Sequence, residues 1–191
     1  MDKQIALTCR SAWFYLHQIS KIKKYLDVDQ TKSVIHAHVT SRLDQNNSLL
    51  IGLPKKKLSR LQIVQNAAAR LITGLKKRDH VTPTLMKLHW LPIESRITYK
   101  VVLLTYKSLH GKGPDYLREL LTYYVPGRTL RSMADNKLSV PNVHYADTRR
   151  RAFGRKAAEE WNNLPIHLRH KDSIESFKKD LKTHLFVEAY Q

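Results

Sequence analysis

The sequence LSRLQIVQNAAARLITG occupies residues 58–74 and is followed by a basic break, LKKRDH, at 75–80. The chain continues as VTPTLMKLHWLPIESRITYKVVLLTYKSLHG over residues 81–111. In the first part, apolar residues return every three or four positions, and the alanine run at 67–69 has high helix propensity. Gly74 suits a helix C-terminal cap. These features predict a helix that ends at Gly74.

A second helix is predicted at residues 92–109, and it is expected to be buried. Apolar side chains such as Ile97, Val101 and Val102 cover most of its circumference, which is typical of a helix enclosed by the core. Within a sector of about 40° on the helical wheel lie three cations, Arg96, Lys100 and Lys107. That stripe is expected to face water or a ligand.

Outward from this stretch, the N-terminal part also shows helical spacing. The pattern predicts an amphipathic helix at 4–26 and a second one with Asp29 as its N-cap. Whether the second helix ends at the polar cluster 44–47 or reaches Leu53 is left open by periodicity. The apolar face expected for the first helix consists of Ile5, Cys9, Ala12, Trp13, Leu16 and Ile19.

Shorter elements complete the expected organisation. Thr82 followed by Pro83 predicts the start of a short helix that runs to about His89, and another is expected from Pro114 through Leu121. The helical period then disappears over 128–143, which indicates an irregular segment or a weak hairpin.

Two helices are expected in the C-terminal part. One is predicted over 148–161 and ends at the sequence NNLP. The last one opens with Asp172 as N-cap and Glu175 three residues later, in a capping-box arrangement. The expected fold class is mainly α, with a helical bundle first and two helices after the irregular segment.

The charge balance narrows the choice of partner. Lys and Arg number 34 against 16 Asp and Glu, which gives a formal charge of +18 and a pI near 10.1. Such a charge is expected to find a polyanion, and nucleic acid is the usual one. Cys9 is the single cysteine, so an internal disulfide and a cysteine zinc site are excluded, and an intracellular setting, nucleus or cytoplasm, is expected. No apolar run approaches the roughly 18 residues of a membrane span, and no membrane partner is expected.

The sequence offers little catalytic chemistry. His36 and His38 fall on opposite sides of a helix, whereas two ligands of one metal would be spaced i and i+4. The run Tyr-Ala-Asp-Thr at 145–148 resembles the Tyr-x-Asp-Asp turn of polymerases, but Thr148 replaces the second carboxylate that Mg²⁺ needs. Cys9 lies on an apolar helix face, where a buried and inert thiol is expected. Neither catalytic nor metal-binding residues are therefore predicted.

Clusters of basic residues are what the chain does supply. Each cluster alone suits a solvated surface, but together with the net charge they favour contacts with backbone phosphates, whose strength falls with salt. Trp90, Tyr99, Tyr123 and Tyr124 could stack on bases, although core packing is expected for most of them. The predicted nucleic-acid-binding residues are Lys55, Lys56, Lys57, Arg70, Lys76, Lys77, Arg78, Arg96, Lys100, Lys107, Arg149, Arg150 and Arg151.

Several phrases of the sequence resemble the C-terminal part of reverse transcriptases from non-LTR, LINE-type retrotransposons, on the jockey and chicken-repeat side of that group. The phrases are VTSRLDQNNSLLIGLPKKKLSRLQIVQNAAARLITG at 39–74, residues 79–121, RAFGRKAAEEWNNLPIHLR at 151–169 and SIESFKKDLKTHLF at 173–186. They occur in the family's order and cover nearly the whole chain. One departure is Gln45-Asn46, where the family usually has a Tyr-Cys pair.

The resemblance implies a division of labour within a larger RNA-directed DNA polymerase. Residues 1–125 would correspond to a helical thumb and 126–191 to a C-terminal extension. The implied task is to hold RNA, DNA or an RNA–DNA hybrid while the palm, which would also bind Mg²⁺, transfers nucleotides. The fingers and palm would be a separate partner region. The chain by itself is then expected to be non-catalytic and to need no cofactor.

Three hypotheses follow from the sequence. The first is a fragment of the reverse transcriptase that binds template-primer backbone. The second is a non-functional transposon relic, or a helical protein that depends on a partner. The third, an independent polymerase or nuclease, has the least support because no carboxylate cluster is present.

Overall fold

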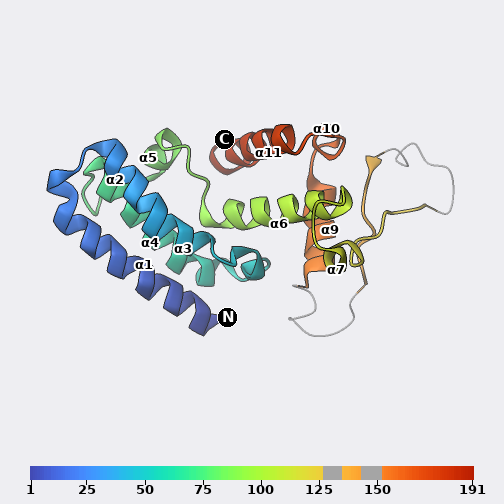
Figure 1. The fold of residues 1–191 in the computed structure, drawn as a ribbon, viewed down its shortest axis with the longest axis horizontal. Helices are drawn as coiled ribbons and strands as arrows, with labels where there is room; N and C mark the ends of the chain where they lie inside the picture. The colour runs from blue at the N-terminus through green and yellow to red at the C-terminus, as the bar shows by residue number, and fades with distance from the viewer. Residues whose placement is uncertain (127–134, 143–151) are drawn as a thin grey trace. The chain divides into compact units, whose positions relative to one another are not determined.

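A computed structural model describes residues 1–126, 135–142 and 152–191 of the chain (Figure 1). Internal contacts divide it into two units, Met1–Arg96 with Ala189–Gln191, and Ile97–Glu188. The division between the units falls between Arg96 and Ile97, inside a helix. The resemblance instead places a domain boundary between residues 125 and 126, and that boundary stays a prediction. The mainly α fold class is confirmed, and the described residues contain no sheet.

The first unit is built from helical segments of very different lengths. In chain order these are α1 (Asp2–Ile22), η1 (Lys23–Tyr25), α2 (Val28–Ile35), η2 (His36–Thr40), α3 (Ser41–Asp44), η3 (Asn47–Leu50), α4 (Lys55–Thr73), α5 (Thr82–Lys87) and the first turn of α6 (Ile93–Leu109). Of the two short types, η1 and η3 are 3-10 helices and η2 is a π-helix.

The core of the first unit forms where α1 packs against α4 (Figure 1). The predicted apolar face of α1 is confirmed at its five buried positions, Ile5, Cys9, Ala12, Leu16 and Ile19. From α4 the buried apolar side chains include Leu61, Val64, Ala68 and Ile72. Trp13 was expected on the same face, but its side chain is 45% exposed because it lies at the edge of the buried arc.

Several helix boundaries of the first unit differ from those that the sequence predicts. Asp27, not Asp29, is the N-cap of α2, because its carboxylate accepts from the Gln30 N–H at 2.7 Å while Gln30 completes a capping box. The polar cluster does end the helical run: α3 stops at Asp44, and Asn46 takes the left-handed conformation with φ of 55°. Thr82 is already helical and Val81 is the N-cap of α5.

The second unit continues α6 and adds α7 (Asp115–Arg118), α9 (Phe153–Asn163), α10 (Ile166–Arg169) and α11 (Ile174–Tyr190), the last up to Glu188. Its core includes stacked rings: Tyr106 lies 4.1 Å from Phe177 between ring centroids. The Tyr106 hydroxyl donates to the Lys171 carbonyl at 2.9 Å. The buried helix predicted at 92–109 is confirmed by Val101, Val102 and Tyr106.

Predictions for the second unit were less accurate at their edges. Helix α7 stops at Arg118 rather than reaching Leu121. Helix α9 is described from Phe153, and residues 148–151 lie outside the described part. Helix α11 begins at Ile174, one residue after the start that an Asp172 cap implies, and Glu175 accepts from Lys178 at 2.8 Å.

The segment expected to be irregular or a weak hairpin is described only over 135–142. An isolated antiparallel bridge pairs Leu138 with Tyr123, and the Tyr124 N–H donates to the Lys137 carbonyl at 2.9 Å. Among the described helices, none combines the length and apolar character needed to cross a bilayer.

Candidate nucleic-acid interface

The loop after α4 forms a compact cationic turn, here called the basic corner and made of Lys76, Lys77 and Arg78. Gly74 ends the helix as predicted, with φ of 74° and its N–H donating to the Arg70 carbonyl at 2.8 Å. The Asp79 carboxylate then accepts from the Lys76 N–H at 2.7 Å, and the Asp79 N–H donates back to the Lys76 carbonyl at 3.1 Å. This reciprocal pair closes the turn and leaves all three cations of the basic corner exposed.

Arg70 is placed differently from the basic corner. Its side chain is half-buried and donates to the Asp79 carbonyl at 3.0 Å, and its buried Nε has no hydrogen-bond partner among the described residues. Arg70 therefore stabilises the loop after α4, which contains the basic corner. Its contact with phosphate stays a prediction.

Lys23 lies beside Gly74, two residues before the basic corner, and is not among the predicted residues. A Cβ built on Gly74 would lie 3.9 Å from the Lys23 Nζ, so the ammonium stands at the C-terminal end of α4. The partial negative charge of a helix C-terminus favours a cation there. The basic sequence IKKYL at 22–26 was the available signal, but only the fold brings it next to the corner.

The cluster at the other end of α4 is partly neutralised. Lys57 pairs with Asp2 at 2.9 Å, and Lys55 lies 3.6 Å from Glu94 in a largely exposed pair. Lys56 is exposed and forms no ion pair with a described residue. At 1.5 Å per residue, the two end residues of α4, Lys55 and Thr73, lie about 27 Å apart, so the two clusters belong to opposite ends of the helix.

The cationic stripe predicted on α6 is not uniformly available. Arg96 pairs with Asp44, its Nε lying 2.8 Å from Oδ1, and only 18% of its side chain is exposed. Lys100 is exposed without an ion pair among the described residues, whereas Lys107 is half-buried. The pKa of Glu175 is lowered first by Lys178 and to a smaller degree by Lys107. The stripe thus contains one cation with clear access to solvent.

The remaining predicted cluster, Arg149, Arg150 and Arg151, lies outside the described residues, as does the run at 145–148.

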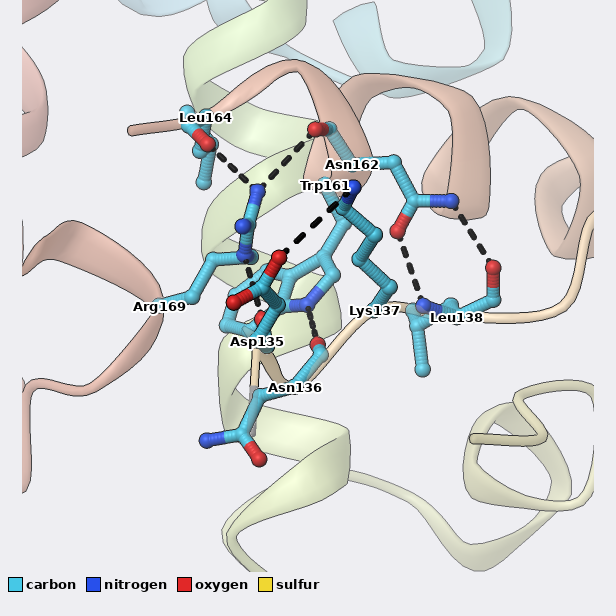
Figure 2. A network of polar contacts seen from close by, with 8 residues as sticks. All are labelled: Asp135, Asn136, Lys137, Leu138, Trp161, Asn162, Leu164 and Arg169. Atoms are coloured by element: carbon cyan, nitrogen blue, oxygen red, sulfur yellow. Dashed lines mark hydrogen bonds and ion pairs between the residues drawn. The ribbon is translucent and has the colours of Figure 1, made fainter. Parts of the chain in front are cut away.

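Arg169 is a buried cation whose guanidinium is hydrogen-bonded within the second unit (Figure 2). It is 5% exposed and donates to three backbone carbonyls, those of Asp135 at 2.8 Å, Asn162 at 3.0 Å and Leu164 at 2.5 Å. Burial lowers the pKa of its guanidinium, and the Asp135 charge opposes that shift. Because its guanidinium donates to carbonyls at the end of α9 and at Asp135, Arg169 stabilises the fold of the second unit.

The same network fixes the 135–138 segment in place. The Trp161 indole donates to the Asn136 carbonyl at 2.7 Å (Figure 2). The Asn162 amide bonds both backbone groups of Leu138, each at 2.8 Å.

Other polar groups serve packing. His38 stacks on Tyr15 at 5.2 Å and His36 meets the edge of Trp90, which is buried. Burial raises the pKa of the Cys9 thiol more than the Arg60 charge lowers it. No cluster of metal-ligating side chains occurs within the described ranges.

Aromatic side chains suited to base stacking are unevenly exposed. Trp90 is enclosed and Tyr99 is half-buried, whereas Tyr123 and Tyr124 are 48% and 51% exposed. Stacking by the last two stays a prediction.

Comparison with protein-family models, curated proteins and solved structures gives no match to this chain. The resemblance seen in its sequence therefore remains an expectation, and the interface is defined by its own chemistry.

Proposed function

We propose that the chain is the helical thumb and C-terminal part of a non-LTR retrotransposon reverse transcriptase and that it binds the nucleic-acid backbone. The observation that carries this proposal is the basic corner, with Lys23 beside it. The Asp79 carboxylate binds the backbone of this turn at the Lys76 N–H, and none of the three charged side chains forms an ion pair with a described residue, so their charges are available to phosphate. The sequence phrases that resemble the family support the wider assignment.

The chemistry of the basic corner favours binding without sequence preference. Lysine ammonium groups and exposed arginines neutralise phosphates and release counterions, which carries no information about bases. Three phosphates neutralised at the corner would give log K a slope of about −3 against log salt on duplex DNA. Specificity would come from the shape of the duplex, and an RNA–DNA hybrid is the ligand that the resemblance favours.

The assignment also defines what the chain leaves to its parent enzyme. Nucleotidyl transfer and Mg²⁺ binding would belong to the palm, which the chain would contact as a partner region. The resemblance supports an intracellular site of action, where the polymerase meets its template. Mg²⁺-dependent primer extension by the isolated chain would overturn this assignment.

The test is binding of a 20-base-pair RNA–DNA hybrid by fluorescence anisotropy between 50 and 300 mM KCl. We expect affinity to fall steeply with salt, with a slope of about −3 or steeper. Absence of binding at 50 mM, or affinity independent of salt, would contradict the proposal.

A further inference from the structure

A groove of about 400 Å³ lies between α1 and α4, within the first unit. Two of its large apolar side chains are open to solvent: Trp13 is 45% exposed and Ile63 is 57% exposed. It is lined by Ala6, Cys9, Arg10, Trp13, Arg60 and Ile63.

The apolar surface extends beyond the groove along α1. Leu7 and Phe14 are 57% and 56% exposed. They lie seven residues apart with Arg10 between them, and this spacing puts all three on one side of the helix. Exposed apolar side chains thus gather on this side of α1, beside the groove and on both sides of Arg10. Gathered exposed apolar side chains of this kind mark interaction sites.

The cations of the groove are unpaired. Arg10 and Arg60 are exposed, and neither forms an ion pair with a described residue. Asp2 is paired with Lys57, whose hydrogen bond is the first cause that lowers the Asp2 pKa, and the charge of Arg60 contributes last. The groove therefore combines an apolar lining with two exposed guanidinium groups, neither of which is in an ion pair with a described carboxylate.

We propose that this groove binds an acidic amphipathic helix of a partner protein. Apolar residues at i, i+3 or i+4 and i+7 of that helix would cover Trp13 and Ile63. Aspartate or glutamate on its flanks would pair with Arg10 and Arg60, because a guanidinium binds a carboxylate through two parallel hydrogen bonds.

The chemistry of the lining favours a protein over a nucleic acid. The aliphatic side chain of Ile63 in the groove, like that of Leu7 beside it, cannot stack on bases in the way aromatic rings do. Tryptophan and arginine are the residues that most often dominate the energy of protein interfaces. The groove shares no residue with the basic corner, so we expect mutations to separate the two binding activities.

Trp13 supplies a local signal for the test. The chain has three tryptophans, and the other two, Trp90 and Trp161, are 4% and 1% exposed. The probe is a designed 18-residue helical peptide with leucines at the i, i+4, i+7 and i+11 positions and glutamates on both flanks. Added to the full chain, it should shift Trp13 emission to the blue and reduce acrylamide quenching, and Trp13→Phe should remove both changes.

Charge reversal then tests the two arginines. Arg10→Glu with Arg60→Glu should weaken peptide binding at least tenfold, and replacing the peptide's glutamates by lysines should restore binding to this variant. The milder single variants Arg10→Gln and Arg60→Gln should each weaken it about threefold. Arg118→Glu, which makes the charge change of one of the two arginine-to-glutamate substitutions at an exposed site on α7, should leave affinity unchanged.

Three results would overturn the proposal. One is equal peptide affinity in the wild type and in the Arg10→Glu/Arg60→Glu variant, once circular dichroism has shown that the variant is folded. Another is the absence of any Trp13 signal at 1 mM peptide. The third is protection of Trp13 by a single-stranded oligonucleotide but not by the peptide, which would assign the groove to nucleic acid.

Discussion

At the scale of single residues, the availability of a cation depends on partners distant in sequence. Arg96 was placed on an outward stripe by its helical position, yet it is bound by Asp44, 52 residues earlier. Arg169 is buried against backbone carbonyls, which no local pattern indicates. By contrast, the exposure of the basic corner could be predicted, because a glycine cap and a polar turn place residues at the surface.

Tyr190 provides a pH-dependent test at this scale. Its hydroxyl donates to the Trp90 carbonyl at 2.6 Å, and burial raises its pKa to about 12. Because the pKa is raised in the folded state, the contribution to stability is present below pH 10, the ordinary value, and is lost as pH rises towards 12.

We therefore expect Tyr190→Phe to lower the free energy of unfolding by about 1 kcal/mol at pH 8, the usual net value of a hydrogen bond. The difference between wild type and variant should shrink at pH 11, as measured by urea denaturation. Tyr25→Phe, at a residue that is 75% exposed, is the control and should change little at either pH. If the difference in unfolding free energy between wild type and Tyr190→Phe stayed constant from pH 8 to pH 11, the Tyr190 hydroxyl proton would not contribute to stability.

At the scale of elements, periodicity was sufficient to predict α1, α4 and α6, because each carries a long apolar arc. Caps were harder to predict: the sequence pattern favours Asp29, whereas Asp27 is the N-cap because Gln30 completes its capping box. The groove between α1 and α4 could not be predicted at all, since it depends on how two distant helices pack.

The Arg169 network is the element-scale prediction. Replacing Arg169 by leucine would leave buried carbonyls at the end of α9 and at Asp135 without donors, so we expect unfolding to become easier by about 3 kcal/mol or more. Arg169→Lys should recover little of the lost stability, because lysine lacks the forked geometry of a guanidinium.

Urea denaturation followed by near-ultraviolet circular dichroism measures this effect, since Trp161 belongs to the network. Arg118→Leu, at an exposed position, should change stability by no more than about 0.5 kcal/mol. If Arg169→Leu were as mild as that control, the network would not be holding the second unit together.

At the scale of the whole molecule, the net charge of +18 was the most informative sequence property. It predicts a polyanionic partner but not where the partner binds. The structure distinguishes cations that are paired, as at Lys57, from those that are open, as at Lys56 and the basic corner. Charge alone therefore predicts the class of ligand, and folding selects the residues.

The most direct measurement compares two triple variants of the full chain on the RNA–DNA hybrid. Lys76→Ala, Lys77→Ala and Arg78→Ala remove the basic corner. The matched control removes three cations that are ion-paired at 2.6–2.8 Å, through Lys156→Ala, Lys171→Ala and Lys178→Ala.

Both variants lose the same charge, so a nonspecific effect of net charge would weaken binding equally. We predict that the corner variant loses affinity and that its salt slope becomes shallower by about 2 to 3, since each phosphate contact contributes about 0.9. The control variant should keep a slope close to that of the wild type. Equal losses in the two variants, or wild-type binding by the corner variant, would contradict the assignment of the basic corner as the nucleic-acid interface.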